Sequence, residues 1–195
     1  MIENFVQKNI VPLMRENKFK KKGLIWNRTE NIVTHVVELQ TSQWNDAESH
    51  NFTINYGVWA KQLWLILWDN KVPNIIGEDA CFPRFRIGEL TEYSTTDLWW
   101  SLESVSNEKL SNEIQDLIKN EILYHFNGCD TIDKMLSLAE KAGGWQHPAD
   151  RLSYAILCHL SGRCETAETI LSEMEEDDKL KAWKQRIEKV RTRLD

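Results

Sequence analysis

Alternating apolar and polar residues predict a group of β-strands in the first half of the chain. The clearest alternation is Phe52–Trp59, where every second side chain up to Val58 is large and apolar. Because neighbouring side chains of a strand point to opposite faces, one face of this strand is expected in the core and the other toward polar surroundings. The same alternation predicts strands at Leu24–Arg28, Ile32–Thr41 and Arg84–Glu89.

The rest of the chain shows the three- and four-residue spacing of amphipathic helices. A helix is predicted from Ile2 to Met14, and Pro12 must kink it or start a second turn, because proline has no N–H to donate. Further helices are predicted at residues 61–68, 107–124, 131–141, 148–160, 164–174 and 179–194. The apolar stripe of the last one suits docking on the body of the protein or on a partner helix.

The order of these elements predicts an α+β fold with an antiparallel sheet of about four strands and helices packed on one face. The glycine pair at 143–144 separates this part from an all-helical remainder. We therefore predict an α+β domain at residues 1–142 and a helical extension at 145–195. Lys20–Lys22 are interpreted as a solvated linker, and Gly57 within a strand indicates a bulge or a close approach by another group.

The composition is that of a soluble globular protein, with 195 residues, 42% of them hydrophobic and 28% charged. A formal net charge of -6 argues against general binding to nucleic acid or to an anionic membrane. The most apolar window, Val58–Trp68, is too short to span a bilayer. The four cysteines lack metal-binding spacing and are interpreted as buried, reduced thiols, which favours a cytoplasmic location.

The polar side of the predicted sheet supplies the candidate binding residues. Arg84 and Arg86 are two apart, so their guanidinium groups share one face, and strand pairing can bring them beside Asn55 and Gln40. Such groups suit the recognition of phosphate or carboxylate, but pairing with the protein's own acids is the slightly favoured interpretation. The full set of candidates, with the loop and strand tryptophans included, is Gln40, Trp44, Asn55, Trp59, Arg84, Arg86 and Glu89.

The sequence contains none of the motifs G-x-x-x-x-G-K-[ST], H-E-x-x-H, G-x-S-x-G and G-x-G-x-x-G. Asp46, Glu48 and His50 alternate in one loop and could gather a metal ion, although a solvated loop is the favoured interpretation. His35 is interpreted as a half-buried, hydrogen-bonded core histidine. No catalytic residue, cofactor or metal is therefore implied, and an enzyme is disfavoured.

Four segments in one order carry a family resemblance: F-K-K-K-G-L-I-W-N-R, V-E-L-Q-T-S-Q-W, F-T-I-N-Y-G-V-W and F-R-I-G-E-L. The chain resembles, over about Phe5 to Lys141, the bacterial family called domain of unknown function 4304. The resemblance carries over no catalytic residues, because the family has none established. Lys18 departs from the family, which tends to place a glycine there, and is expected to alter the turn from helix to strand.

Two functions remain as hypotheses. The favoured one is a non-enzymatic protein-binding module that uses an open sheet face, because tryptophan and arginine are common interface anchors and the chain has 9 Trp. An immunity-type role against a basic toxin is compatible with the acidic charge. The alternative is a phosphate- or nucleotide-handling enzyme centred on Arg84 and Arg86.

Overall fold

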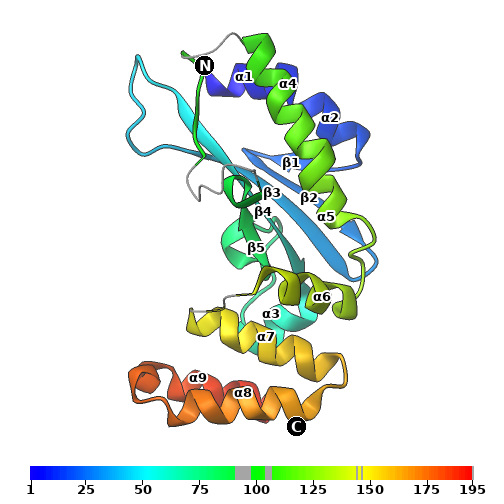
Figure 1. The fold of residues 1–195 in the computed structure, drawn as a ribbon, viewed down its shortest axis with the longest axis vertical. Coiled ribbons are helices and arrows are strands. Elements are labelled where there is room, and N and C mark those ends of the chain that lie inside the picture. Colours follow the sequence, from blue (N-terminus) through cyan, green and yellow to red (C-terminus); the bar gives the residue numbers. More distant parts are fainter. Residues whose placement is uncertain (91–97, 104–106, 144, 146, 195) are drawn as a thin grey trace.

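The computed structural model describes residues 1–90, 98–103, 107–143, 145 and 147–194, with the side chains of 89 and 90 excepted. In this part of the chain an antiparallel sheet of six strands lies against a layer of helices, and further helices stack beyond one end of the sheet (Figure 1). The strands are β1 (Lys20–Lys22), β2 (Ile25–Glu30), β3 (Val33–Thr41), β4 (Asn51–Ala60), β5 (Arg84–Arg86) and β6 (Trp100–Ser101). The predicted α+β class with an antiparallel sheet is confirmed.

The helices follow the predicted order. They are α1 (Ile2–Asn9), α2 (Val11–Glu16), α3 (Lys61–Trp68), α4 (Asn107–Leu117), α5 (Leu123–Phe126), α6 (Ile132–Ala142), α7 (Pro148–Leu160), α8 (Cys164–Glu176) and α9 (Lys184–Leu194). Shorter helical turns are η1 (Glu78–Ala80), η2 (Ile87–Leu90), η3 (Ile118–Ile122) and η4 (Asp178–Trp183). The helix predicted at 179–194 thus begins as a 3₁₀ turn and becomes α-helical only at Lys184.

The sheet runs in the order β1-β2-β3-β4-β5, and β6 pairs with the first residues of β4. The long β3–β4 pairing places Thr41 opposite Phe52 and Val33 opposite Ala60. This register brings Phe52, Tyr56 and His35 to one face of the sheet, which we call the helical face. There Phe5 of α1 contacts Phe52, and Phe126 of α5 stacks on His35 at 4.5 Å between ring centroids.

The N-terminal turn explains two features of the sequence. Pro12 lies in the first turn of α2, where its missing N–H costs nothing, so it starts a second helix as one of the two predicted outcomes. Lys18 has a φ of 64°, in the left-handed region that glycine adopts without strain. A glycine at this position in the resembling family therefore suits the backbone, and the lysine of this chain adopts the same conformation.

Two strand predictions need correction. Lys20–Lys22 form β1, the edge strand beside β2, and are not a linker; exposed lysines on an edge strand oppose pairing with another chain. The strand predicted at Arg84–Glu89 ends at Arg86 and continues as the turn η2. The edge of β4 that a longer β5 would pair with is occupied at Asn51 and Phe52 by β6. With the short strands β1 and β6, the sheet has six strands among the described residues, whereas about four were predicted.

The helix predicted at 107–124 contains a wide π-helical turn, η3, between α4 and α5. From Ile114 onward, four fully buried side chains are spaced by four residues: Ile114, Ile118, Ile122 and Phe126. A regular α-helix turns by about 400° in four residues, so such a row drifts by about 40° at each step. The wide turn offsets the drift and keeps all four side chains in the core.

The C-terminal helices pack on the body of the protein. Arg186 of α9 donates to the carbonyl oxygens of Leu67 and Trp68 at the end of α3, at 3.0 and 3.3 Å. Arg193 donates to the carbonyl oxygen of Ile66 at 2.7 Å. Buried residues of α7, α8 and α9 belong to the same hydrophobic cluster as those of the sheet. The apolar stripe of α9 therefore docks on its own chain.

All four cysteines are free. Cys81, Cys129 and Cys158 are buried, as predicted, whereas Cys164 is exposed at the start of α8. Of the predicted boundary at 143–144, Gly143 has a φ of 60° and ends α6, while Gly144 lies outside the described residues. No helix in the described part of the chain is long and apolar enough to cross a bilayer.

Candidate functional site

The face of the sheet opposite the helical face carries the predicted polar residues where β3, β4 and β5 lie side by side. Asn55 of β4 stands between Glu38 of β3 and Arg86 of β5 in the strand register. Its side-chain amide donates to Oε1 of Gln40 at 2.8 Å. Asn55 is buried, whereas Gln40 and Arg84 are exposed. We call these five residues, Glu38, Gln40, Asn55, Arg84 and Arg86, the polar row.

Gly57 allows the chain to approach β4 closely beside the polar row. A Cβ atom at this position would lie 2.6 Å from Cβ of Cys81 and 2.8 Å from the carbonyl oxygen of Pro83. Both distances are far below van der Waals contact, so only glycine fits. The close approach that Gly57 indicates in the sequence is confirmed, and it fixes the position of Arg84 directly opposite.

The segment 69–83, between α3 and β5, covers part of this face. Asn27 of β2 holds it by two hydrogen bonds, from its amide to the carbonyl oxygen of Ile76 at 2.9 Å and from the Ile76 N–H to its own oxygen at 2.8 Å. Beneath the segment lies a small hydrophobic cluster of Val36, Trp59, Ile76 and Cys81. Trp59 is only 7% exposed. At the Gln40 end of β3 the face is open to solvent, since Gln40 and Thr41 are exposed.

Three carboxylates share the region with the two guanidinium groups. The Glu78 N–H donates to Oε2 of Glu38 at 2.9 Å. Burial raises the pKa of Glu78, a change that Arg84 opposes and the neighbouring carboxylates of Glu38 and Asp79 reinforce. Burial also raises the pKa of the Cys81 thiol well above its ordinary value, so this thiol is not a nucleophile at neutral pH. The positive charges of the polar row thus lie among the protein's own acids.

The loop between β3 and β4 extends beyond the sheet (Figure 1) and presents Trp44 to solvent with 79% of its surface exposed. Side chains hold the loop in shape. Asn45 bonds to both backbone groups of Asn51, at 2.8 and 2.7 Å. Oδ1 of Asp46 accepts the N–H groups of Glu48 and Ser49, both at 2.8 Å, and these bonds lower the Asp46 pKa. The indole is thus exposed on an ordered loop.

The base of this loop is tied to the segment after β6. Glu103 accepts the backbone N–H of His50 at 3.1 Å, and its other oxygen lies 2.6 Å from Nδ1 of the same residue. The Ser101 hydroxyl donates to Glu103 and, with the His50 bonds, lowers the Glu103 pKa to about 2. The carboxylate of Asp46 and the ring of His50 therefore already have partners, and no three potential ligands gather among the described residues.

The structure brings some of the candidate residues together and separates others. Gln40, Asn55, Arg84 and Arg86 lie together in the polar row, Trp59 is beneath the covering segment, and Trp44 is on the loop. The side chain of Glu89 lies outside the described residues. Sequence reasoning missed Glu78 and Asp79, which sit in an irregular connection without a periodic pattern to place them.

Comparison with known families gives one result. A family model described as Domain of unknown function (DUF4304) matches residues 10–128, more than half of the chain. The chain belongs to the DUF4304 family. Neither a comparison with curated proteins nor one with solved structures gives a match. The polar row and the Trp44 loop lie inside the DUF4304 match, whereas α6 to α9 lie beyond it.

Proposed function

We propose that this DUF4304 protein is a cytoplasmic, non-enzymatic module that binds another protein through Trp44 and the exposed end of the polar row. The observation that carries the proposal is the exposed indole on an ordered loop. Tryptophan is prominent among the residues that dominate the binding energy of interfaces. A loop that is already ordered loses little entropy on binding. Exposed Gln40 and Thr41 connect this loop to the polar row along β3.

Charge indicates the kind of partner. Trp44 is followed closely by Asp46 and Glu48, both exposed, in a chain whose formal net charge is -6. Complementary potentials speed association and suppress wrong partners, so a partner with a basic surface fits this loop. An immunity-type role, in which the acidic module covers a basic toxin, agrees with this charge.

The electrostatics of the polar row argue against the alternative, a phosphate-handling enzyme. A phosphate group at Arg84 or Arg86 would meet the negative charges of Glu38, Glu78 and Asp79. Phosphate sites normally concentrate positive charge and backbone N–H groups. The two guanidinium groups offset the negative charge of these carboxylates, and they suit polar contacts at the rim of a protein interface.

The test is a comparative pull-down from the native host with tagged wild-type protein, Trp44→Ala and Ile32→Ala. Ile32 is the matched control, because it is an exposed apolar residue, at 50%, in the turn before β3, whereas Trp44 lies in the loop after β3. We expect a stoichiometric partner with wild type and Ile32→Ala, and a loss of about 30-fold in its affinity for Trp44→Ala. Absence of any stoichiometric partner, with the toxins encoded nearby included in the search, would refute the proposal. Equal capture by Trp44→Ala would refute the role of the loop.

A further inference from the structure

A cavity of about 670 Å³ lies on the helical face of the sheet, away from the Trp44 loop. It opens where β5, α5 and α6 meet, and its volume lies within the range of small-molecule sites. Its wall combines aromatic and aliphatic side chains with polar ones in about equal measure. The lining residues are Phe85, Tyr124, His125, Asn127, Leu138, Lys141 and Ala142.

A buried tyrosine fixes the orientation of His125 in this wall. Tyr56 is fully buried on β4, and its hydroxyl lies 2.8 Å from Nδ1 of His125. The Tyr56 ring stacks on Phe85 at 5.0 Å, and His125 meets Phe85 edge-on at 5.6 Å. The wide helical turn η3 ends just before α5, so the same local geometry that keeps Phe126 in the core places His125 at the cavity. Such π-type turns are frequent at functional sites.

The imidazole of His125 is neutral at neutral pH. Burial lowers its pKa, and the nearby ammonium of Lys141 lowers it further, while Glu121 acts in the opposite direction. A phenol is the better donor and an imidazole nitrogen the better acceptor, which favours the tautomer in which Nδ1 accepts from Tyr56 and the ring proton is on Nε2. No hydrogen-bond partner for Nε2 occurs among the described residues. His125 therefore offers an N–H donor.

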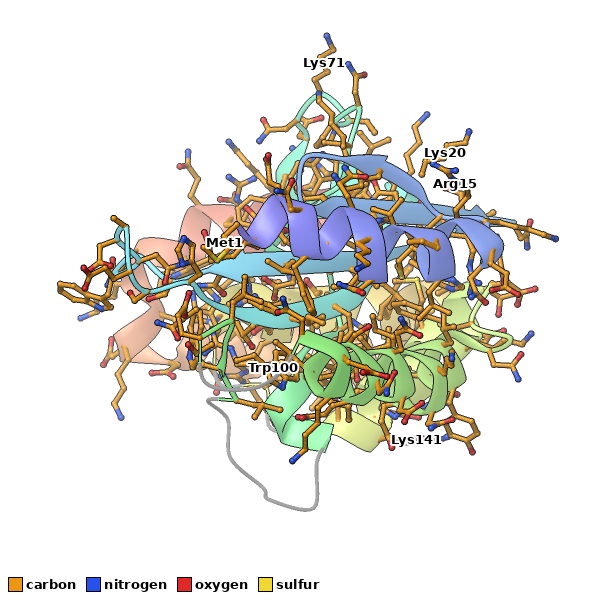
Figure 2. All side chains as sticks on the ribbon, turned by 90° about the horizontal axis from the view of Figure 1, so that it is seen from above. Met1, Arg15, Lys20, Lys71, Trp100 and Lys141 are labelled. Atoms are coloured by element: carbon orange, nitrogen blue, oxygen red, sulfur yellow. The ribbon has the colours of Figure 1, made fainter. Side chains whose placement is uncertain are left out.

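Lys141 supplies the positive charge of the cavity. It is exposed, and within the described part of the chain its ammonium group forms neither a hydrogen bond nor an ion pair. Figure 2 shows Lys141 on the opposite side of the molecule from Lys20, so it is separate from the basic edge strand β1. Tyr124, 72% exposed, forms an aromatic rim on α5. An exposed aromatic ring and an unpaired cation at one opening are typical of ligand contacts.

We propose that this cavity binds a small planar organic monoanion, an aryl carboxylate, with its ring between Phe85 and Tyr124 and its carboxylate on Lys141 and His125. The aromatic walls favour a flat, apolar body. One ammonium group and one neutral N–H donor match the single charge and two oxygens of a carboxylate. Glu121, close enough to act on His125, makes a doubly charged phosphate a poor match.

Calorimetric titration with 2-naphthoate tests the proposal, with neutral 2-naphthamide as the matched ligand. We expect saturable one-to-one binding of the carboxylate and at least tenfold weaker binding of the amide, since a charged hydrogen bond contributes more than a neutral one. Chemical-shift changes in an NMR spectrum should centre on His125, Lys141 and Tyr124.

Lys141→Gln should weaken 2-naphthoate binding by about tenfold. Lys134→Gln is the matched control, because it removes the same charge from the same helix outside the cavity lining and should leave the affinity unchanged. Three results would overturn the proposal: absence of saturable binding in the millimolar range, equal affinities of Lys141→Gln and wild type, or shift changes that map elsewhere.

Discussion

His35 is fully buried on β3, and both of its ring nitrogens have partners. Nε2 lies 2.6 Å from the carbonyl oxygen of Cys129, and Nη2 of Arg28 lies 3.1 Å from Nδ1. Because a carbonyl only accepts and a guanidinium only donates, the imidazole is neutral with its proton on Nε2. Burial is the main reason that its pKa is lowered from 6.5. The histidine is thus a structural residue, and more deeply buried than its sequence position predicts.

We expect His35 to make the protein less stable as the pH falls below 6.5. In the unfolded chain an ordinary histidine takes up a proton near this pH, whereas folded His35 does so only at a lower pH, so acid favours unfolding. The loss approaches about 1.4 kcal/mol per pH unit between the two pKa values. An NMR titration of the His35 ring, alongside urea unfolding at pH 7.5 and 5.5, measures it. A His35 midpoint at or above 6.5 would contradict this assignment.

The residues of the polar row could be predicted from sequence because a strand alternates with a period of two. Arg84, Arg86 and Asn55 follow from that period once the strands pair. Glu78 could not be placed, since it lies in an irregular segment whose path depends on contacts made by Asn27 and Glu38. His125 gave no signal either, because its position depends on a helical turn that departs from the usual period.

At the scale of whole elements, the periodicity of the sequence predicts whether a segment is a helix or a strand. Where the element begins and ends depends on the elements packed beside it. The β5 strand is shorter than its alternation predicts, because β6 pairs with the start of β4. Strand β1 exists although three lysines show no apolar alternation, because β2 offers it a free edge. Such outcomes are set by tertiary pairing, which the local pattern does not contain.

The contact between α3 and α9 also depends on tertiary structure. The carbonyl oxygens at the end of a helix need donors, and those of α3 receive them from Arg186 and Arg193 of α9. The Arg186 guanidinium also lies 5.0 Å from the ring centroid of Trp68. Helix α9 therefore supplies hydrogen-bond donors to the end of α3, and α3 lies within the DUF4304 match.

Arg186→Ala should lower the free energy of unfolding by about 1–2 kcal/mol, through loss of charged hydrogen bonds and of the cation–π contact. Lys184→Ala is the control, because Lys184 is exposed on the same helix and should change stability by less than about 0.5 kcal/mol. Urea unfolding at neutral pH provides the measurement. Equal midpoints for the two variants would show that the α3–α9 contact contributes nothing.

At the scale of the whole molecule, the α+β part and the helical extension share one hydrophobic cluster. Composition predicted a division near residue 143, and that division stays a prediction. What the fold does provide is two faces with different properties. The helical face carries an open cavity beside His125, and the opposite face carries the polar row below the Trp44 loop. The polar row and the Trp44 loop lie within the DUF4304 match, whereas the cavity is lined both by matched residues and by Leu138, Lys141 and Ala142 beyond it.

The most direct test of the proposed binding function is photocrosslinking in the native cell, with a benzophenone amino acid placed at Gln43, next to Trp44. The matched control carries it at Gln185, an exposed residue of the same type on α9. We expect one discrete crosslinked protein of basic charge from position 43, and none of that mass from position 185. No crosslinked product at position 43, or the same products from both positions, would contradict the account.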